Sequence, residues 1–250
     1  MTSGLSFVTL GVGDAFSALR YSSCLALEAE GQVLLVDCPH PIRKMMREAS
    51  ASSGVELDAD RVSGLVLTHL HADHSSGVEG LGYFSFFVLK RKLRLLAHPE
   101  VTHRLWDGHL AAGMEDLIHK PGGEPQRHGF EDYFEPLALS TQTAVRFGPF
   151  SIECRRTYHH IPTTALRIRA GGRCLGYSAD TAYDEGLISW LAEADLLVHE
   201  TNHGVHTPYE KLAALPAPLR AKMRLIHYPD DFDLEASNIE PLAQGRRYTV

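Results

Sequence analysis

Thr68-His69-Leu70-His71-Ala72-Asp73-His74-Ser75-Ser76-Gly77 is the stretch that decides the fold of this chain. Three imidazoles and one carboxylate lie within six positions, directly after the apolar run Leu65-Val66-Leu67. Both groups are ligands that zinc and similar divalent ions prefer. Because alternate residues of a strand share a face, a strand that ends in a tight turn would direct His69 and His71 toward one ion. The turn would then present Asp73 and His74 to a second ion, so the motif predicts a dinuclear metal site.

The histidine content of the chain offers a simpler explanation, since 15 of its 250 residues are histidine. Some clustering could arise by chance or belong to a solvated loop. A loose surface cluster, however, needs neither a hydrophobic strand before it nor a Ser-Ser-Gly turn after it. The surroundings of the motif therefore favour metal binding.

The composition is that of an ordinary globular protein, with 44% hydrophobic and 22% charged residues. No apolar run approaches the roughly 18 residues that a membrane-spanning helix needs, and the first residues do not resemble a secretion signal. The four cysteines show no Cys-x-x-Cys spacing, which indicates free thiols in a reducing compartment. A formal charge of −7 argues against broad nucleic-acid binding. We therefore expect a cytoplasmic protein without membrane association.

Strand-like and helix-like segments alternate in both halves of the chain. We expect strands at 6–10, 24–28, 33–36, 65–67, 151–155, 165–169, 173–177, 196–199 and 223–227. We expect helices at 41–49, 99–112, 187–194 and 208–215. Interleaving without an internal linker predicts one α/β domain over residues 1–250. Residues 119–134, rich in glycine, proline and charge, are expected to form a loop over the site.

His-x-His-x-Asp-His after a short strand resembles the signature of the metallo-β-lactamase superfamily, and the likeness extends from about Phe7 to Phe232. The segment Gly11-Val-Gly-Asp-Ala-Phe16 looks like the opening glycine turn of that superfamily. Asp37 looks like its strand-terminal aspartate, which supports the metal loop without binding metal. The resemblance implies a four-layer αββα sandwich with the metal ligands on loops at one edge of two facing sheets.

The remaining ligands that the resemblance implies lie further along the chain, in His159-His-Ile-Pro-Thr, Tyr177-Ser-Ala-Asp180-Thr and Leu225-Ile-His227-Tyr. The implied first ion is bound by His69, His71 and His159. The implied second ion is bound by Asp73, His74 and His227, and Asp180 bridges the two. Taken alone, Asp180 would read as a turn former or helix cap, and His227 as a structural histidine. His160 rivals His159, because adjacent strand residues face opposite ways and only one can point inward, but the spacing to Pro162 resembles that of related phosphodiesterases best when His159 is the ligand.

Two such cations lower the pKa of a shared water enough to hold hydroxide near neutral pH, and they clamp the reacting oxygens. The resemblance therefore implies a hydrolase in which a metal-bound hydroxide attacks the substrate. Asp73 could orient that hydroxide or accept its proton. Five imidazoles and two carboxylates without a thiolate favour zinc, while manganese fits the same ligand set.

The segment Val198-His199-Glu200-Thr201, followed by His206-Thr207, is similar to one in ribonuclease Z-like phosphodiesterases. His206 could stabilise a phosphoryl oxygen or protonate the leaving alkoxide, and Glu200 could orient it. The alternatives are a surface-loop histidine and a structural carboxylate, and His203 is a weaker rival for the same role. This resemblance predicts a phosphodiesterase that acts on a small phosphodiester such as a cyclic nucleotide.

Ribonuclease Z enzymes bind transfer RNA with a long basic arm. The segment between His159 and Asp180 is too short to contain such an arm, so we do not expect transfer RNA as the substrate. A carboxyl-ester, lactone or thioester hydrolase is the alternative, with Tyr83 or Tyr158 polarising the carbonyl. A non-enzymatic metal or nucleotide sensor would have lost ligands. Relatives in the superfamily often form homodimers, and the aromatic-rich segment 80–89 offers either a dimer face or core packing.

Overall fold

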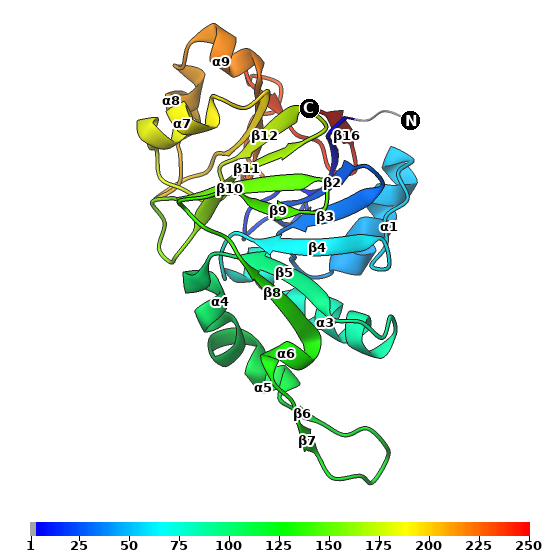
Figure 1. Cartoon of the computed structure of the whole chain (residues 1–250). Helices are drawn as coiled ribbons and strands as arrows, with labels where there is room; N and C mark the ends of the chain where they lie inside the picture. Colours follow the sequence, from blue (N-terminus) through cyan, green and yellow to red (C-terminus); the bar gives the residue numbers. More distant parts are fainter. Residues whose placement is uncertain (1–3) are drawn as a thin grey trace.

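Short apolar runs form the strands of this chain, which assemble into two seven-stranded sheets that lie face to face (Figure 1). The computed structural model describes residues 4–250. In spatial order, the first sheet contains β16 (Arg247–Thr249), β1 (Ser6–Gly11), β2 (Cys24–Ala29), β3 (Gln32–Val36), β4 (Val62–Leu67), β5 (Leu93–Ala97) and β8 (Phe134–Ala138). The second contains β15 (Glu240–Pro241), β14 (Met223–Ile226), β13 (Leu196–Glu200), β12 (Arg173–Tyr177), β11 (Thr164–Ala170), β10 (Phe150–Arg156) and β9 (Val145–Phe147).

Each face of the first sheet contributes to a different hydrophobic core. Leu34 and Val36 of β3 belong to the core that includes the second sheet, whereas Val33 and Leu35 belong to the core under the helices. This separation follows from the two-residue period of a strand. Both faces of the sheet are therefore covered, as the runs of buried residues in β1 to β4 require.

Helices cover the outer faces of both sheets (Figure 1). On the first sheet lie α1 (Ile42–Ser53), α2 (Ala72–Ser75), α3 (Val78–Phe87), α4 (Pro99–Leu105), the π-helical turn η1 (Trp106–Leu110), α5 (Ala111–Met114) and α6 (Phe130–Tyr133). On the second lie α7 (Glu185–Leu191), α8 (Tyr209–Ala213) and α9 (Ala217–Ala221). The architecture is the predicted αββα sandwich of the metallo-β-lactamase fold.

Four neighbouring strands at one end of each sheet are parallel, and this arrangement positions the site. Strands β3, β4, β5 and β8 pair in parallel, as do β12, β13, β14 and β15. The carboxyl ends of parallel strands meet at one edge, where loops can converge on a ligand. Asp37, His69, Asp180 and His227 all follow such ends.

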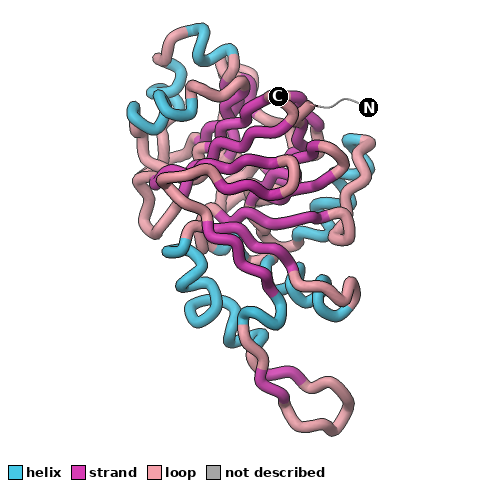
Figure 2. Tube along the Cα trace, viewed as in Figure 1, coloured by secondary structure: helices cyan, strands magenta, loops and turns pink. Residues whose placement is uncertain are grey.

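The predicted loop 119–134 differs from the structure. The chain there forms a hairpin of β6 (Asp116–Leu117) and β7 (Gln126–Arg127), which projects away from the sandwich (Figure 2). The pairing of Asp116 with Arg127 and of Leu117 with Gln126 is too short to give a periodic sequence pattern. The predicted helix 99–112 is also interrupted, since η1 separates α4 from α5.

The aromatic segment that follows the metal loop forms α3. Tyr83, Phe84 and Phe86 pack against the core under the helices, while Phe87 is 43% exposed. Most of these rings thus serve core packing, and a homodimer stays a prediction. Within the described part of the chain, no helix is long and apolar enough to cross a membrane.

Candidate metal centre

The histidine motif forms a bend between β4 and α3 that is tied to the turn after β3. His69 follows β4, His71 is the extended residue that precedes the one-turn helix α2, and Asp73 and His74 lie in that helix. The Cys38 amide donates to the His74 carbonyl oxygen at 2.7 Å, and the Gly77 amide donates to the Cys38 carbonyl oxygen at 2.7 Å. A β-carbon on Gly77 would lie 2.6 Å from the Pro39 carbonyl oxygen. Only glycine permits this close approach.

Asp37 supports the motif from below. One of its carboxylate oxygens accepts a hydrogen bond from the Thr68 amide at 2.8 Å, and the other lies 2.8 Å from Nδ1 of His74. Thr68 Oγ1 in turn lies 2.9 Å from Nδ1 of His69. These contacts occupy Nδ1 of both histidines and leave each Nε2 free to face the site. Thr68 is a positioning residue that sequence reasoning missed, although it directly precedes the first histidine.

Folding brings all seven predicted ligands into two adjoining groups. Both groups consist of donor atoms that lie within 4.8 Å of one another. One contains His69, His71, His159 and Asp180, and the other contains Asp73, His74, Asp180 and His227. Asp180 belongs to both, as a bridging carboxylate would.

Several contacts across the site join distant parts of the chain. Nε2 of His159 lies 3.0 Å from Nδ1 of His71, and Nε2 of His227 lies 3.2 Å from a carboxylate oxygen of Asp73. His160 is exposed and lies outside both groups. The structure therefore brings His159 to the site in preference to its neighbour.

Unpartnered buried atoms show that these residues fit metal ions. Nε2 of His69, Nε2 of His74 and Oδ1 of Asp180 are buried without a hydrogen-bond partner. Leaving such atoms unpaired costs free energy, and buried polar groups in native proteins have partners. Imidazole nitrogens and carboxylate oxygens are suitable ligands for divalent cations. The cluster is therefore a divalent metal site.

The two groups differ in their electrostatics. Burial lowers the pKa of His159 to about 4 and holds the pKa of His69 well below its usual value. Burial also opposes the charging of His227, but Asp180 and Asp73 outweigh it and raise the pKa of that imidazole to about 9. In the first group neutral imidazoles offer lone pairs to a cation. In the second, carboxylates already attract positive charge.

Backbone strain marks the same edge of the sheets. Of the described non-glycine residues with positive φ, Asp37 (63°), Ala179 (50°) and His227 (60°) directly follow or adjoin strand ends at the site. Non-glycine residues in this region cost on the order of 1–3 kcal/mol each, and such residues cluster at functional sites. Tertiary contacts must therefore hold these turns, and the hydrogen bond from the His227 amide to the Val12 carbonyl oxygen at 2.8 Å is one of them.

A third polar group adjoins the second metal group. It contains Glu200, His206 and His227. Glu200 is buried at the end of β13, and its Oε1 accepts from the Thr181 amide at 2.9 Å and lies 3.0 Å from Nδ1 of His206. His203 instead points outward and lies 3.5 Å from Asp231. Of the two rival histidines, only His206 is near the predicted ligands.

Other residues considered from the sequence lie elsewhere. The Tyr83 hydroxyl donates to the Gly113 carbonyl oxygen, and Tyr158 is 69% exposed. Arg156 and Arg167 pair with carboxylates, namely Glu100 for Arg156 and Glu153 and Glu193 for Arg167. These two arginines are therefore engaged by carboxylates of neighbouring elements.

One family of known proteins matches almost the whole chain. Residues 5–245 match the family described as Anti-Pycsar protein Apyc1. The chain is 29% identical over 270 residues to the Anti-Pycsar protein Apyc1 of Bacillus phage 010DV004, with 98% of each chain covered.

Solved structures share the fold. The metallo-β-lactamase fold protein YhfI from Bacillus subtilis is similar with a TM-score of 0.77 at 19% identity, covering 99% of this chain and 100% of that one. A diphosphatase from the PhnP family has a TM-score of 0.73 at 14% identity, with coverage of 98% and 97%.

Proposed function

This chain belongs to the Anti-Pycsar protein Apyc1 family, and from that premise we propose that it hydrolyses small phosphodiesters, cyclic nucleotides among them. It is a metal-dependent hydrolase of the metallo-β-lactamase fold. The observation that carries the proposal is the position of His206. This histidine, paired with the buried Glu200, adjoins the metal group of His227. The alkoxide that leaves a phosphate ester of a sugar is strongly basic and needs a proton donor, and this pair can supply one.

We assign His69, His71 and His159 to one ion and Asp73, His74 and His227 to the other, with Asp180 shared. Zinc is the proposed metal because all donors are imidazole nitrogens or carboxylate oxygens, although manganese fits the same set. When bound, such ions supply Lewis acidity that activates water near neutral pH and stabilises charge on phosphoryl oxygens. Asp73 belongs to the second group and keeps 9% of its side chain exposed, so we propose that it orients a water or accepts its proton.

Glu200 and His206 form the acid side of the proposed mechanism. Because Oε1 of Glu200 lies beside Nδ1 of His206, the imidazole is oriented with Nε2 free. Burial alone would lower the pKa of His206, but the carboxylate of Glu200 outweighs burial and raises it. Nε2, the ring nitrogen that Glu200 does not engage, is the atom from which His206 donates a proton to the leaving alkoxide in this mechanism. Glu200 acts through His206 and is a positioning residue.

The surroundings of the site favour a small substrate. Between His159 and Asp180 the chain forms only the antiparallel pair β11–β12, with Gly171 and Gly172 at its turn. There is thus no arm in this segment to hold a transfer RNA. A formal charge of −7 agrees with that conclusion.

The direct test combines metal analysis with a phosphodiesterase assay. We expect two metal ions per chain by elemental analysis and turnover of bis(p-nitrophenyl) phosphate and cyclic AMP, both lost after chelation and restored by zinc or manganese. Thioesters and lactones serve as the comparison substrates. Metal-loaded protein that cleaves these compounds but no phosphodiester would refute the proposed substrate class.

The His206→Ala variant tests the acid. We expect it to keep its metal content while turnover of cyclic AMP falls by roughly 10²–10⁴-fold, the usual effect of a general acid. The loss should be smaller for bis(p-nitrophenyl) phosphate, because p-nitrophenolate leaves without protonation. Equal losses on both substrates would remove His206 from the role of proton donor. His203→Ala, which changes an exposed histidine of the same loop, is the matched control.

A further inference from the structure

Glu200, at the end of β13, has one engaged and one unengaged carboxylate oxygen. Its side chain is buried, and Oε1 accepts from the Thr181 amide at 2.9 Å and lies 3.0 Å from Nδ1 of His206. The other oxygen, Oε2, is buried and has no hydrogen-bond partner in the described part of the chain. Leaving a buried acceptor unpaired costs free energy, so a partner for Oε2 is to be expected.

His227 presents a matching unengaged atom. Its Nε2 faces the second metal group, 3.2 Å from a carboxylate oxygen of Asp73 and 3.5 Å from one of Asp180. Its Nδ1 is buried and, among the described residues, has no hydrogen-bond partner. Oε2 of Glu200 lies 4.0 Å from this nitrogen. Two buried atoms without partners, one a possible donor and the other an acceptor, therefore face each other.

Metal binding determines which nitrogen of His227 holds the ring proton. A nitrogen that binds a cation offers its lone pair, so a neutral ring bound through Nε2 holds its proton on Nδ1. Ligating histidines almost always donate that second N–H to a carboxylate, a carbonyl or a water. The first half of the site shows the pattern, since Nδ1 of His74 lies 2.8 Å from a carboxylate oxygen of Asp37. Glu200 is the carboxylate in the corresponding place beside His227.

Hydrogen bonds around Glu200 hold it in this position. The Glu200 amide donates to Ser178 Oγ at 2.9 Å, and its carboxylate accepts from the amide of Thr181, the residue after the proposed bridge. Thr207, the residue after His206, donates from Oγ1 to the Thr181 carbonyl oxygen at 3.0 Å. The end of β13, the turn after β12 and the loop of His206 are thus tied together around one carboxylate.

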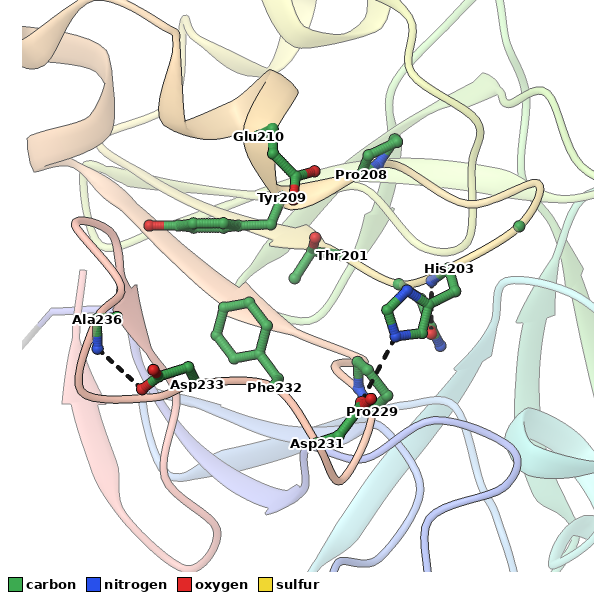
Figure 3. A pocket seen from close by; sticks show the side chains of 12 residues that line it. Thr201, His203, Pro208, Tyr209, Glu210, Pro229, Asp231, Phe232, Asp233 and Ala236 are labelled. Carbon is green, nitrogen blue, oxygen red and sulfur yellow. Dashed lines mark hydrogen bonds and ion pairs between the residues drawn. The ribbon is translucent and has the colours of Figure 1, made fainter.

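The loop that carries His206 also borders a cavity of about 440 Å³, whose lining includes the rings of Tyr209 and Phe232 (Figure 3). There His203 lies 3.5 Å from a carboxylate oxygen of Asp231 (Figure 3). The two histidines of this loop therefore pair with different carboxylates. Of the two, His206 is the one whose carboxylate also faces a proposed metal ligand.

We propose that Glu200 positions two histidines at once, the acid His206 through Oε1 and the metal ligand His227 through Oε2. The contact of Oε2 with Nδ1 of His227 shortens from 4.0 Å to a hydrogen bond when the second ion is bound. The inference rests on the proposed assignment of His227 to that ion and deepens it. One buried carboxylate then fixes the proton donor relative to the metal centre, so that binding of the second ion and orientation of the acid are coupled.

A crystal structure of the zinc-loaded wild-type chain tests the contact directly and needs no variant. We expect Nδ1 of His227 and Oε2 of Glu200 to lie about 2.7–3.2 Å apart, the range of an N–H···O hydrogen bond. A separation that stays near 4.0 Å with the second ion bound, or a different acceptor on Nδ1, would overturn the proposal.

Metal affinity tests the consequence of the contact. If the oxygen of Glu200→Gln keeps the contacts with Thr181 and His206, its amino group faces the N–H of His227, a donor against a donor. We expect the affinity for one of the two zinc ions to fall roughly 10–100-fold, while the other ion binds as in the wild type. Competition with a chromogenic chelator measures both affinities without substrate, and Glu131→Gln, at an exposed position of α6, is the matched control. Unchanged affinities, or an equal loss for both ions, would contradict the proposal.

The same substitution in a His206→Ala background separates the two contacts of Glu200. His206→Ala alone should bind both ions as the wild type does, and adding Glu200→Gln should still lower the affinity for one ion by the same factor. If the loss disappeared in this background, Glu200 would act through His206 alone and the proposal would fail.

These measurements also distinguish the inference from the proposed reaction, because none of them requires turnover. A wild-type chain that cleaves no phosphodiester, together with the expected loss of affinity in Glu200→Gln, would refute the reaction and support the positioning role. Phosphodiester turnover together with unchanged metal affinity of Glu200→Gln would support the reaction and refute the positioning role.

Discussion

The two halves of the metal centre are built in different ways. The first sheet supplies His69, His71, Asp73 and His74 from one continuous bend, whereas the second supplies His159, Asp180 and His227 singly from separate loops. Contacts between the halves join residues 88 and 154 positions apart. A continuous motif places several ligands through local geometry. Scattered ligands depend on the packing of one sheet against the other.

The halves are also supported differently. In the first, the buried carboxylate of Asp37 contacts both Thr68 and His74, so side-chain hydrogen bonds orient the motif. In the second, the His227 amide donates to the Val12 carbonyl oxygen at 2.8 Å, so a backbone hydrogen bond holds the turn that carries this ligand. We therefore expect that a weakened supporting contact in the first half reduces metal binding less than the loss of a single ligand in the second half.

Removing Asp180 should break the link between the halves and have the largest effect. We expect Asp180→Ala to abolish dinuclear binding and phosphodiester turnover, because this is the one carboxylate common to both groups. Elemental analysis and the cyclic AMP assay measure the outcome. Asp60→Ala, at an exposed position, is the control. A variant that kept both ions per chain would show that Asp180 is no bridge.

His159 and His160 are adjacent in the second half, and their variants test whether a single ligand there determines metal affinity. His159→Ala should lower metal affinity by more than the roughly 10–100-fold that loss of a supporting contact costs. His160→Ala should bind metal as wild type does, since its ring is exposed and outside both groups. Competition with a chromogenic zinc chelator gives both affinities. The reverse order of effects would make His160 the ligand.

Weakening the support of the first half should have the smallest effect of the three. Asp37→Asn retains the size of the side chain, and asparagine tolerates positive φ. It loses charged hydrogen bonds, so we expect metal affinity to fall roughly 10–100-fold and unfolding free energy to fall by about 2 kcal/mol.

Asp58→Asn provides the comparison for Asp37→Asn in chemical denaturation and metal titration. Asp58 pairs with Arg43 at the surface, with 34% of its side chain exposed. Breaking such a pair costs less than about 1 kcal/mol. If Asp37→Asn behaved like Asp58→Asn in both measurements, the side-chain support described for the first half would be without consequence.

The amino-acid sequence by itself predicted the α/β class, most strands and the contiguous part of the site. It could do so because strand alternation and the spacing His69-x-His71-x-Asp73-His74 are local properties. The likeness of the motif to a known superfamily then predicted the four-layer sandwich, which the structure confirms. The hairpin β6–β7 and the interruption at η1 were missed, since neither carries a periodic signal.

Only the tertiary structure decided which isolated residues reach the metal site. The spacing to Pro162 favoured His159 over His160 only through the resemblance to known phosphodiesterases, whereas the structure shows which of the two rings lies beside the other ligands. The support of His69 by Thr68 is visible only with side chains in place. The same holds for the cavity between Tyr209 and Phe232, whose walls come from two loops. Local sequence determines which face of a strand a side chain occupies, but long-range packing determines which residues that face contacts.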